Sequence, residues 1–405
     1  MSGFLTGHAT HPDWRMALAL AAAQVDAQRV QQESSAAGPL TLGFVYFTDA
    51  YAPHAQALLA ALQERWPGVA WVGNVGIGVA ASGVEYIDEP ALVLMLADLP
   101  AGRFEVYSGA RRLGRIEAFS ALVHADPATA ELGELITELS DRTASGYLFG
   151  GLAASRTGAV HIADGVWHGG LSGVAFSAEV SLVSRVTQGC QPVGPVRRIT
   201  EAERNIVVRL DGEPALPCLL RDLGLDSLDD PRSVLPRLRS TLVGLSDELD
   251  TPLGRGGQFG ADVRVRHLIG LDPARQAIAV AEMVEPGMRL AFCHRDVAAA
   301  RRDLVRICSE IRDEVETAPA ELATSGMSTA AAAQDAPASR RIKGAIYVSC
   351  AGRGGAHFGG PSAELKIVQH ALGDVPLVGF FAGGEIARHH VYGYTGVLTV
   401  FTGAA

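Results

Sequence analysis

Apolar and polar positions along the chain predict an alternation of strands and helices. Gly38 to Thr48, GPLTLGFVYFT, is a continuous apolar and β-rich run that predicts a buried strand. Ala55 to Gly68 has the pattern of a helix that ends at Pro67-Gly68. Val69 to Gly78 and Pro90 to Leu99 predict two further buried strands, the first running into a glycine-rich turn. This order predicts an α/β or α+β unit.

The same layout returns near the end of the chain. GFVYFT from Gly43, a helix and WVGNVGIG resemble GAIYVS from Gly344, a helix and LVGFFAGGE. Gly43 and Gly344 are 301 residues apart, whereas Gly73 and Gly379 are 306 apart, so the first loop of the second copy is longer. The repeat predicts two related lobes with mixed β-sheets flanked by helices. The extra length falls in the glycine-rich loop after GAIYVS.

Other segments add to this picture. Trp14, Leu18, Ala22 and Val25 recur at helical spacing and predict an amphipathic helix packed on the first domain. VHIADGVWHGGLSGVAFS predicts a hairpin. GRGGQFG, residues 254–260, has the composition of a phosphate loop without its Lys-Ser/Thr ending, which favours an ordinary loop. Residues 317–340, rich in Ala, Ser, Thr and Pro, predict a flexible insertion.

Composition and charge restrict the classes of function. The 405 residues carry a formal charge of −10 with no large basic cluster, which argues against a nucleic-acid partner. The five cysteines are odd in number and form no CxxC pair, so we expect no zinc site and a reducing, cytoplasmic location. No segment predicts membrane insertion. We expect no cofactor, because the glycines of GNVGIGV lack the acidic residue that a dinucleotide site needs.

The stretch SCAGRGGAHF, Ser349 to Phe358, carries the strongest candidate chemistry. Backbone N–H groups in a strand-to-helix loop can bind an anion, and Arg353 adds a donor fork for a carboxylate or phosphate. Glu385 follows the neighbouring strand after Gly383 and Gly384. If the two turns meet, a cation and an anion face one cleft, which suits an amino acid. The alternative is that the glycines form tight turns and Arg353 pairs with Glu385 as a structural bridge.

Cys350 raises an enzymatic alternative. His357 could act as the activating base for a thiolate nucleophile. However, no nearby sequence predicts an oxyanion hole or an orienting third group, and a thiol at the end of a strand is commonly a small buried side chain. Whether the chain is an enzyme stays open, with a non-catalytic role favoured.

The chain resembles the FIST family, whose members carry paired FIST N and FIST C domains. The resemblance rests on FGGLAAS from Phe149, the stretch GLSGVAFSAEVSLVSRVTQGCQPVGP, and RHLIGLDPARQAIAVAEMVEPGMRLAFCHRD. Above all it rests on YVSCAGRGG with LVGFFAGGEI near the end. It implies a FIST N-like domain at 1–213 and a FIST C-like domain at 214–405. The turn at Gly73 to Val79 lacks the hydroxyls and acid of the family's usual GCSTAGE-like turn, which argues against a polar ligand site there.

The resemblance implies a cytosolic sensory or signal-transduction protein that binds a small ligand, amino acids among them. We expect a separate signalling partner, because the sequence contains no output module. Arg353 is expected on the ligand's carboxylate and Glu385 on its ammonium group. The predicted ligand-binding residues are Ser349, Cys350, Arg353, Gly354, Phe381, Gly384 and Glu385. The alternatives are a partner-binding scaffold with a vestigial cleft and a Cys350-dependent hydrolase or transferase.

Overall fold

The computed structural model describes residues 3–32, 38–227, 231–247, 263–317 and 340–404. The predicted loop at 254–260 and nearly all of the predicted insertion at 317–340 lie outside them. The chain divides into two compact units. Unit 1 comprises residues 1–186, 304–391 and 395–405, and unit 2 comprises residues 187–303 and 392–394. Unit 2 is therefore an insertion into the sequence of unit 1.

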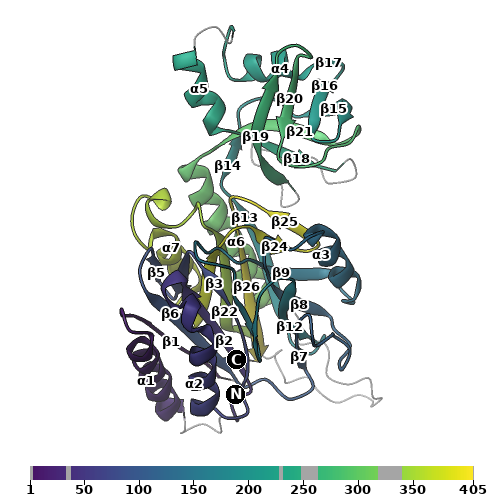
Figure 1. Ribbon diagram of the computed structural model, residues 1–405. Helices are drawn as coiled ribbons and strands as arrows, with labels where there is room; N and C mark the ends of the chain where they lie inside the picture. The colour runs from purple at the N-terminus through teal and green to yellow at the C-terminus, as the bar shows by residue number, and fades with distance from the viewer. Residues whose placement is uncertain (1–2, 33–37, 228–230, 248–262, 318–339, 405) are drawn as a thin grey trace, which may run out of the picture. The chain divides into compact units, whose positions relative to one another are not determined.

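The described residues of unit 1 form three six-stranded sheets with one common strand order; many of these strands are labelled in Figure 1. The first sheet has the order β1 (Phe4–Thr10), β6 (Ala91–Ala97), β2 (Leu42–Thr48), β3 (Ala70–Gly76), β10 (His161–Ala163), β11 (Val166–Trp167). The second has the order β7 (Phe104–Tyr107), β12 (Leu171–Phe176), β8 (Ser120–Ala125), β9 (Tyr147–Leu152), β24 (Glu385–Ala387), β25 (His390–Tyr392). The third has the order β13 (Leu182–Gln188), β26 (Thr395–Ala404), β22 (Arg340–Cys350), β23 (Leu377–Ala382), β4 (Gly78–Ala81), β5 (Val84–Ile87).

Each sheet is built on one parallel strand pair, β2–β3, β8–β9 or β22–β23. A helix connects the two strands of each pair, as a parallel connection requires: α2 (Ala55–Arg65), α3 (Leu132–Asp141) or α7 (Ala363–Leu372). The hairpin that follows each pair joins a different sheet, so β4–β5 extends the third sheet, β10–β11 the first and β24–β25 the second. We call each parallel strand pair, with its connecting helix and the hairpin that follows, a module. Because the hairpin of each module pairs with the sheet of another, the three modules are interlocked.

The predicted fold class and internal repeat are confirmed. The first and last modules are the two copies that the sequence showed, and the predicted hairpin is β10–β11 followed by β12. The module β8–α3–β9 is a third copy that the sequence comparison did not detect. The predicted N-terminal helix is α1 (Trp14–Gln32), whose four predicted apolar positions are all buried.

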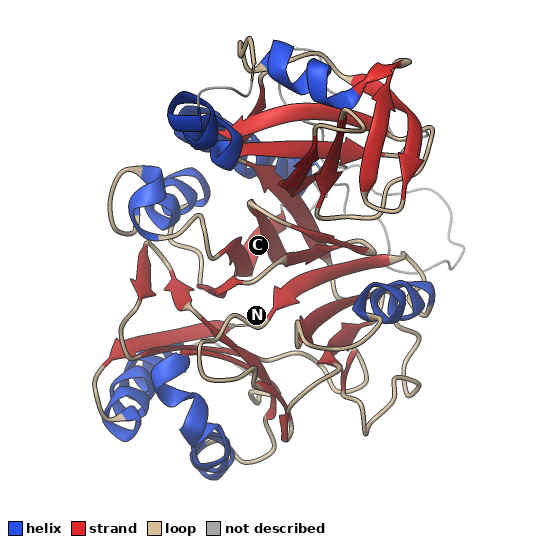
Figure 2. Cartoon of the chain, turned by 45° about the horizontal axis from the view of Figure 1, so that its top comes forward, coloured by secondary structure: helices blue, strands red, loops and turns tan. Residues whose placement is uncertain are grey.

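The core of unit 1 lies where strands of the three sheets meet. Tyr46 on β2, His124 on β8 and Phe380 on β23 are in mutual ring contact, with centroids 5.0 to 5.8 Å apart. All three side chains are fully buried. Figure 1 shows α1, α2, α3 and α7 at the periphery of the unit, and Figure 2 shows helices on the outer side of the strands.

The described part of unit 2 is an antiparallel β-barrel accompanied by helices. Its strands are β14 (Cys190–Pro192), β15 (Arg197–Glu203), β16 (Ile206–Leu210), β17 (Glu213–Pro214), β18 (Thr241–Ser246), β19 (Arg264–Asp272), β20 (Ala277–Val280) and β21 (Arg289–Arg295). β18 pairs with both β19 and β21, which closes the sheet. The helices are α4 (Ala215–Asp222), whose apolar face enters the barrel core, and α5 (Pro231–Ser240). The chain returns toward unit 1 through α6 (Val297–Thr317).

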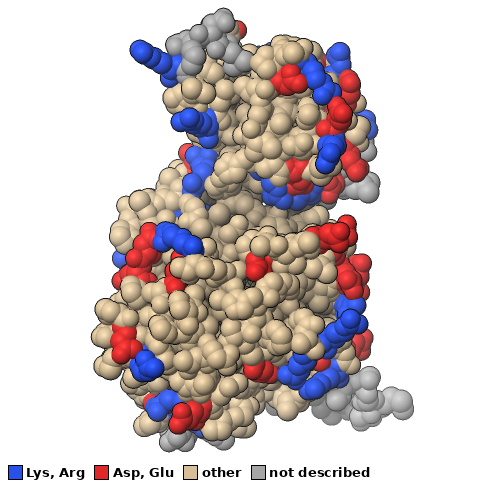
Figure 3. All heavy atoms as spheres, in the orientation of Figure 1, with Lys and Arg blue, Asp and Glu red and all other residues tan. Residues whose placement is uncertain are grey.

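The described surface carries charges of both signs. Blue and red side chains are interspersed on the face shown in Figure 3, with no large basic field. None of the described helices is long and apolar enough to span a bilayer.

Candidate functional site

The two predicted turns lie at the same edge of the third sheet. β22 and β23 are parallel neighbours, with Cys350 in register with Ala382. The N–H of Ala351 donates to the carbonyl of Ala382 at 2.8 Å, which holds the start of the SCAGRGG loop against the GGE turn. Carboxyl ends of parallel strands are where α/β folds commonly place ligands.

The predicted site residues, and Tyr347 beside them, divide between two faces of this sheet. Tyr347, Ser349 and Phe381 share one face, because successive side chains alternate and Ser349 is in register with Phe381. Gly354 lies on this side too: a Cβ there would fall within 3.0 Å of the Phe381 ring. Cys350 belongs to the opposite face. Arg353 lies in the loop beyond the end of β22, so it belongs to neither face of the sheet.

Glu364, which the sequence analysis did not select, is the centre of a buried hydrogen-bond cluster. It stands in the first turn of α7 and accepts from the Tyr347 hydroxyl at 2.7 Å. It also accepts from Ser349 Oγ at 3.0 Å. Arg353 binds the same carboxylate through Nε and Nη2, each 2.8 Å from Oε1. Both side chains of this ion pair are 1% exposed. Arg353 thus forms a structural bridge with Glu364, whereas the alternative interpretation of the sequence gave Glu385 as its partner.

The cluster keeps Arg353 charged. Burial alone would lower the pKa of the guanidinium, but Glu364, Tyr347 and Glu385 together outweigh burial and raise that pKa above its ordinary value. The Phe358 ring lies 5.0 Å from the guanidinium carbon, an additional cation–π contact. Burial and the adjacent Glu364 charge both raise the pKa of Tyr347, so its phenol remains a hydrogen-bond donor.

Glu385 occupies a different environment. It opens β24, is completely buried, and accepts through Oε2 from the N–H and Oγ1 of Thr395 at 3.1 and 2.7 Å. Its Oε1 accepts no hydrogen bond from any described residue. Burial raises the pKa of Glu385 to about 8, although hydrogen bonds from Thr395, the charge of Arg353 and the nearby Cys350 thiol lower it in part. Glu385 is therefore a buried acid with one acceptor oxygen still available.

A second acid missed by the sequence analysis, Glu85, comes from the first module. It lies on β5, and its Oε1 accepts from the N–H groups of Gly355 and Ser362 at 3.2 and 2.6 Å. The interlocked hairpin β4–β5 brings it to this loop, although it is 270 residues from Gly355 in sequence. Its Oε2 is buried and has no hydrogen-bond partner in the described structure. Burial raises its pKa, which the Ser362 N–H lowers in part.

The nucleophile hypothesis for Cys350 gains little from this geometry. The thiol interacts with the Glu385 carboxyl, which is an acid and not the base or cation that activates a cysteine nucleophile. The electropositive surroundings of reactive cysteines are therefore not provided by this neighbour.

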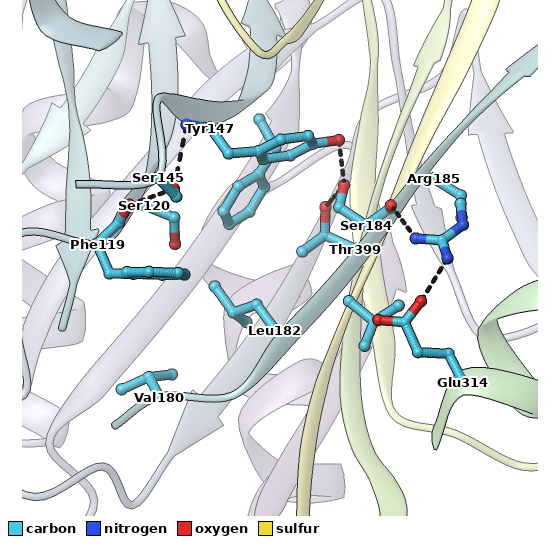
Figure 4. A pocket seen from close by; sticks show the side chains of 12 residues that line it. Phe119, Ser120, Ser145, Tyr147, Val180, Leu182, Ser184, Arg185, Glu314 and Thr399 are labelled. Atoms are coloured by element: carbon cyan, nitrogen blue, oxygen red, sulfur yellow. Dashed lines mark hydrogen bonds and ion pairs between the residues drawn. The ribbon is translucent and has the colours of Figure 1, made fainter. Parts of the chain in front are cut away.

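A separate pocket of about 220 Å³ lies near the amino ends of β8 and β9 (Figure 4). Phe119, Tyr147 and Leu182 contribute apolar surface to it. The hydroxyl of Tyr147 donates to Ser184 Oγ at 3.0 Å, which is 2.8 Å from Thr399 Oγ1. Because these polar groups bind one another, the pocket offers mainly apolar contact. It contains none of the predicted site residues.

Two models of known protein domains match most of the chain. A model of the FIST N domain matches residues 41–213, and a model of the FIST C domain matches residues 215–388. The chain belongs to the FIST family. FIST domains are associated with signal transduction and sensing. The FIST N match covers the β2–β3 and β8–β9 pairs, and the FIST C match ends at Arg388, just after Glu385.

Relatives of similar length match nearly the whole chain in sequence. An uncharacterized protein of Mycobacterium tuberculosis strain H37Rv is 31% identical over 414 aligned positions, covering 98% of both chains. An uncharacterized protein of Mycobacterium bovis is 29% identical, covering 98% of this chain and 97% of its own.

Proposed function

We propose that this FIST protein is a cytosolic sensor that binds a small molecule at the edge formed by the SCAGRGG loop and the GGE turn. The proposed site comprises Ser349, Cys350, Arg353, Gly354, Phe381, Gly384 and Glu385, together with Glu364 and Glu85, which the structure adds. The observation that carries the proposal is Oε1 of Glu385, a fully buried carboxyl oxygen with no hydrogen-bond partner among the described residues. Buried polar atoms of this kind are costly, and a bound donor would satisfy it.

The contacts of Arg353 refine its expected role. Because its guanidinium already binds Glu364, a ligand carboxylate would have to compete with that buried ion pair. We assign Arg353 to positioning Glu364 and to supplying positive charge near Glu385. Phe381 and Tyr347 supply apolar surface on the α7 side.

The alternative is a partner-binding scaffold, and the surface of α1 favours it. Met16, Leu20 and Val30 are 49%, 46% and 69% exposed on one stripe of that helix. Exposed apolar side chains that share a helix face suit a protein partner. Under the proposed function this stripe would be a surface for the separate signalling protein.

A thermal-shift screen against small metabolites, amino acids included, distinguishes the two. A ligand at about one hundred times its Kd stabilises the folded protein by roughly 2.7 kcal/mol. The comparison variant is Glu385→Gln, which keeps the shape of the side chain. Stabilisation of the parent protein that is lost in this variant supports the sensor. If no compound stabilises the parent protein, the result favours the partner-binding scaffold over the sensor.

A further inference from the structure

The charged groups at this edge of unit 1 are unevenly balanced. Glu85, Glu364 and Glu385 are 8%, 1% and 0% exposed, and Arg353 is 1% exposed. Among the described residues of the proposed site, these four carry a carboxyl or guanidinium group: three acids and one base. Electrostatic interactions link Arg353 to Glu385 and Glu85 to Glu364.

The guanidinium of Arg353 forms its ion pair with one of the three acids, Glu364. Both Nε and Nη2 of Arg353 lie 2.8 Å from Oε1 of Glu364. Glu364 also accepts from Tyr347 and Ser349, so this carboxylate is fully hydrogen-bonded. An incoming anion would therefore meet a guanidinium that is already neutralised, and it would enter beside two further carboxyl groups.

The remaining two acids each have one acceptor without a donor. Oε1 of Glu385 and Oε2 of Glu85 are buried and accept no hydrogen bond from the described residues. In each acid the other oxygen is held by donors from the same edge, Thr395 for Glu385 and Gly355 with Ser362 for Glu85. These donors fix the orientation of both carboxyl groups, so each unpartnered oxygen has a fixed position.

We infer that the ligand of this site is an amine, which presents a cationic nitrogen to Oε1 of Glu385 and is not held by a carboxylate on Arg353. This inference rests on the proposed function and names the ligand class. In the unliganded protein a proton neutralises the buried Glu385 carboxyl. A protonated nitrogen can replace that proton, because it supplies both a hydrogen-bond donor and a positive charge to the ionised carboxylate, whereas a hydroxyl supplies only the donor. A carboxylate or phosphate supplies neither.

Matched sets of three compounds test the inference. One set is leucine, isoamylamine and 4-methylpentanoate, which share a side chain but carry both charged groups, only the amine or only the carboxylate. Equivalent sets with aromatic and linear side chains cover other shapes. We expect stabilisation by the amine of at least one set, no stabilisation by its carboxylate-only partner, and at least a tenfold loss of amine affinity in Glu385→Gln.

Calorimetry in two buffers of different ionisation enthalpy gives a second readout that needs no variant. The pKa of Glu385, about 8, means that the unliganded site is mostly protonated at pH 7. Binding of an ammonium ion to the ionised carboxyl should then release about one proton. Leu182→Trp, which fills the pocket of Figure 4, is the control that should leave both results unchanged.

The outcomes separate the two claims. Binding of carboxylates without amines, or amine binding that releases no proton and survives Glu385→Gln, would overturn this inference but leave a sensor. No binding by any member of any set would count against the proposed function itself.

Discussion

Arg353 places two guanidinium nitrogens, Nε and Nη2, 2.8 Å from a single oxygen of Glu364, and both side chains are almost completely excluded from solvent. The pair joins the loop after β22 to the first turn of α7. Three of the first five residues after β22 are glycines, which restrict the path of the loop little by themselves, so side-chain contacts help to fix that path. The ion pair is therefore part of the framework of the site.

Removing the negative charge of this pair should be strongly destabilising. Glu364→Gln leaves Arg353 buried without its counter-ion, and breaking a buried pair in this way typically costs about 3–5 kcal/mol. Urea denaturation measures the change in the free energy of unfolding. Glu138→Gln is the matched control, because its partner Arg142 and Glu138 are 47% and 59% exposed and an exposed pair contributes at most about 1 kcal/mol. Equal effects at the two positions would contradict the framework role of Arg353–Glu364.

Glu385 should make the protein less stable as the pH rises. Its pKa is about 8 in the folded protein against 4.5 ordinarily, so between these values the folded state binds a proton that the unfolded state has lost. The free energy of unfolding therefore falls across this interval, by an amount on the order of 5 kcal/mol, and the loss is complete above pH 8. Denaturation of the parent and Glu385→Gln at pH 5.5 and 8.5 measures the difference. Parallel pH profiles would show that Glu385 is ionised at neutral pH.

Gly354 should be required for the close packing of the loop. A Cβ at this position would lie 2.3 Å from Ile87 Cδ1 and 2.9 Å from Phe381 Cε1. Gly354→Ala should therefore lower the free energy of unfolding by about 1–3 kcal/mol. Gly360→Ala is the control, because no atom lies within 4 Å of its added methyl group. If both variants unfold at the same urea concentration, the loop does not pack on β5 and β23 as described.

Unit 1 should fold without unit 2. The N–H of Gln188 donates to Asp303 Oδ2 at 2.7 Å, so the two ends of the insertion lie next to each other. Replacing residues 187–303 with a short Gly-Ser linker keeps all three parallel strand pairs, and we expect one cooperative unfolding transition. Circular dichroism during urea denaturation is the measurement. A broad, non-cooperative transition would show that the three modules depend on the inserted barrel.

The strands and helices of the first and last modules could be predicted from sequence because their strands are long apolar runs. The middle module was missed because its first strand, SALVHA, is short and its helix follows an acidic, proline-containing loop. The exchange of hairpins between sheets leaves no signal in a single sequence, since it depends on contacts between distant segments. Glu85 reaches the loop only through this exchange.

The site was predicted in part for the same reason. The sequence placed Arg353 and Glu385 at neighbouring strand ends, and the structure shows those ends side by side. The sequence indicates a role for Glu364 less clearly than for Arg353 and Glu385. It shares the buried stripe of α7 with Leu365 and Val368, and a carboxylate in an apolar stripe indicates a buried partner. Which residue becomes that partner depends on the conformation of the loop after β22. The glycines of this loop allow many conformations, so the sequence alone does not predict it.

The most direct test of the account is a crystal structure of the protein with the compound that stabilises it most. The account predicts density for the ligand at the carboxyl ends of β22 and β23, with a ligand nitrogen within hydrogen-bonding distance of Glu385 Oε1 and the Arg353–Glu364 pair intact. Ligand density in the pocket of Figure 4, or a ligand carboxylate that has displaced Glu364 from Arg353, would contradict it.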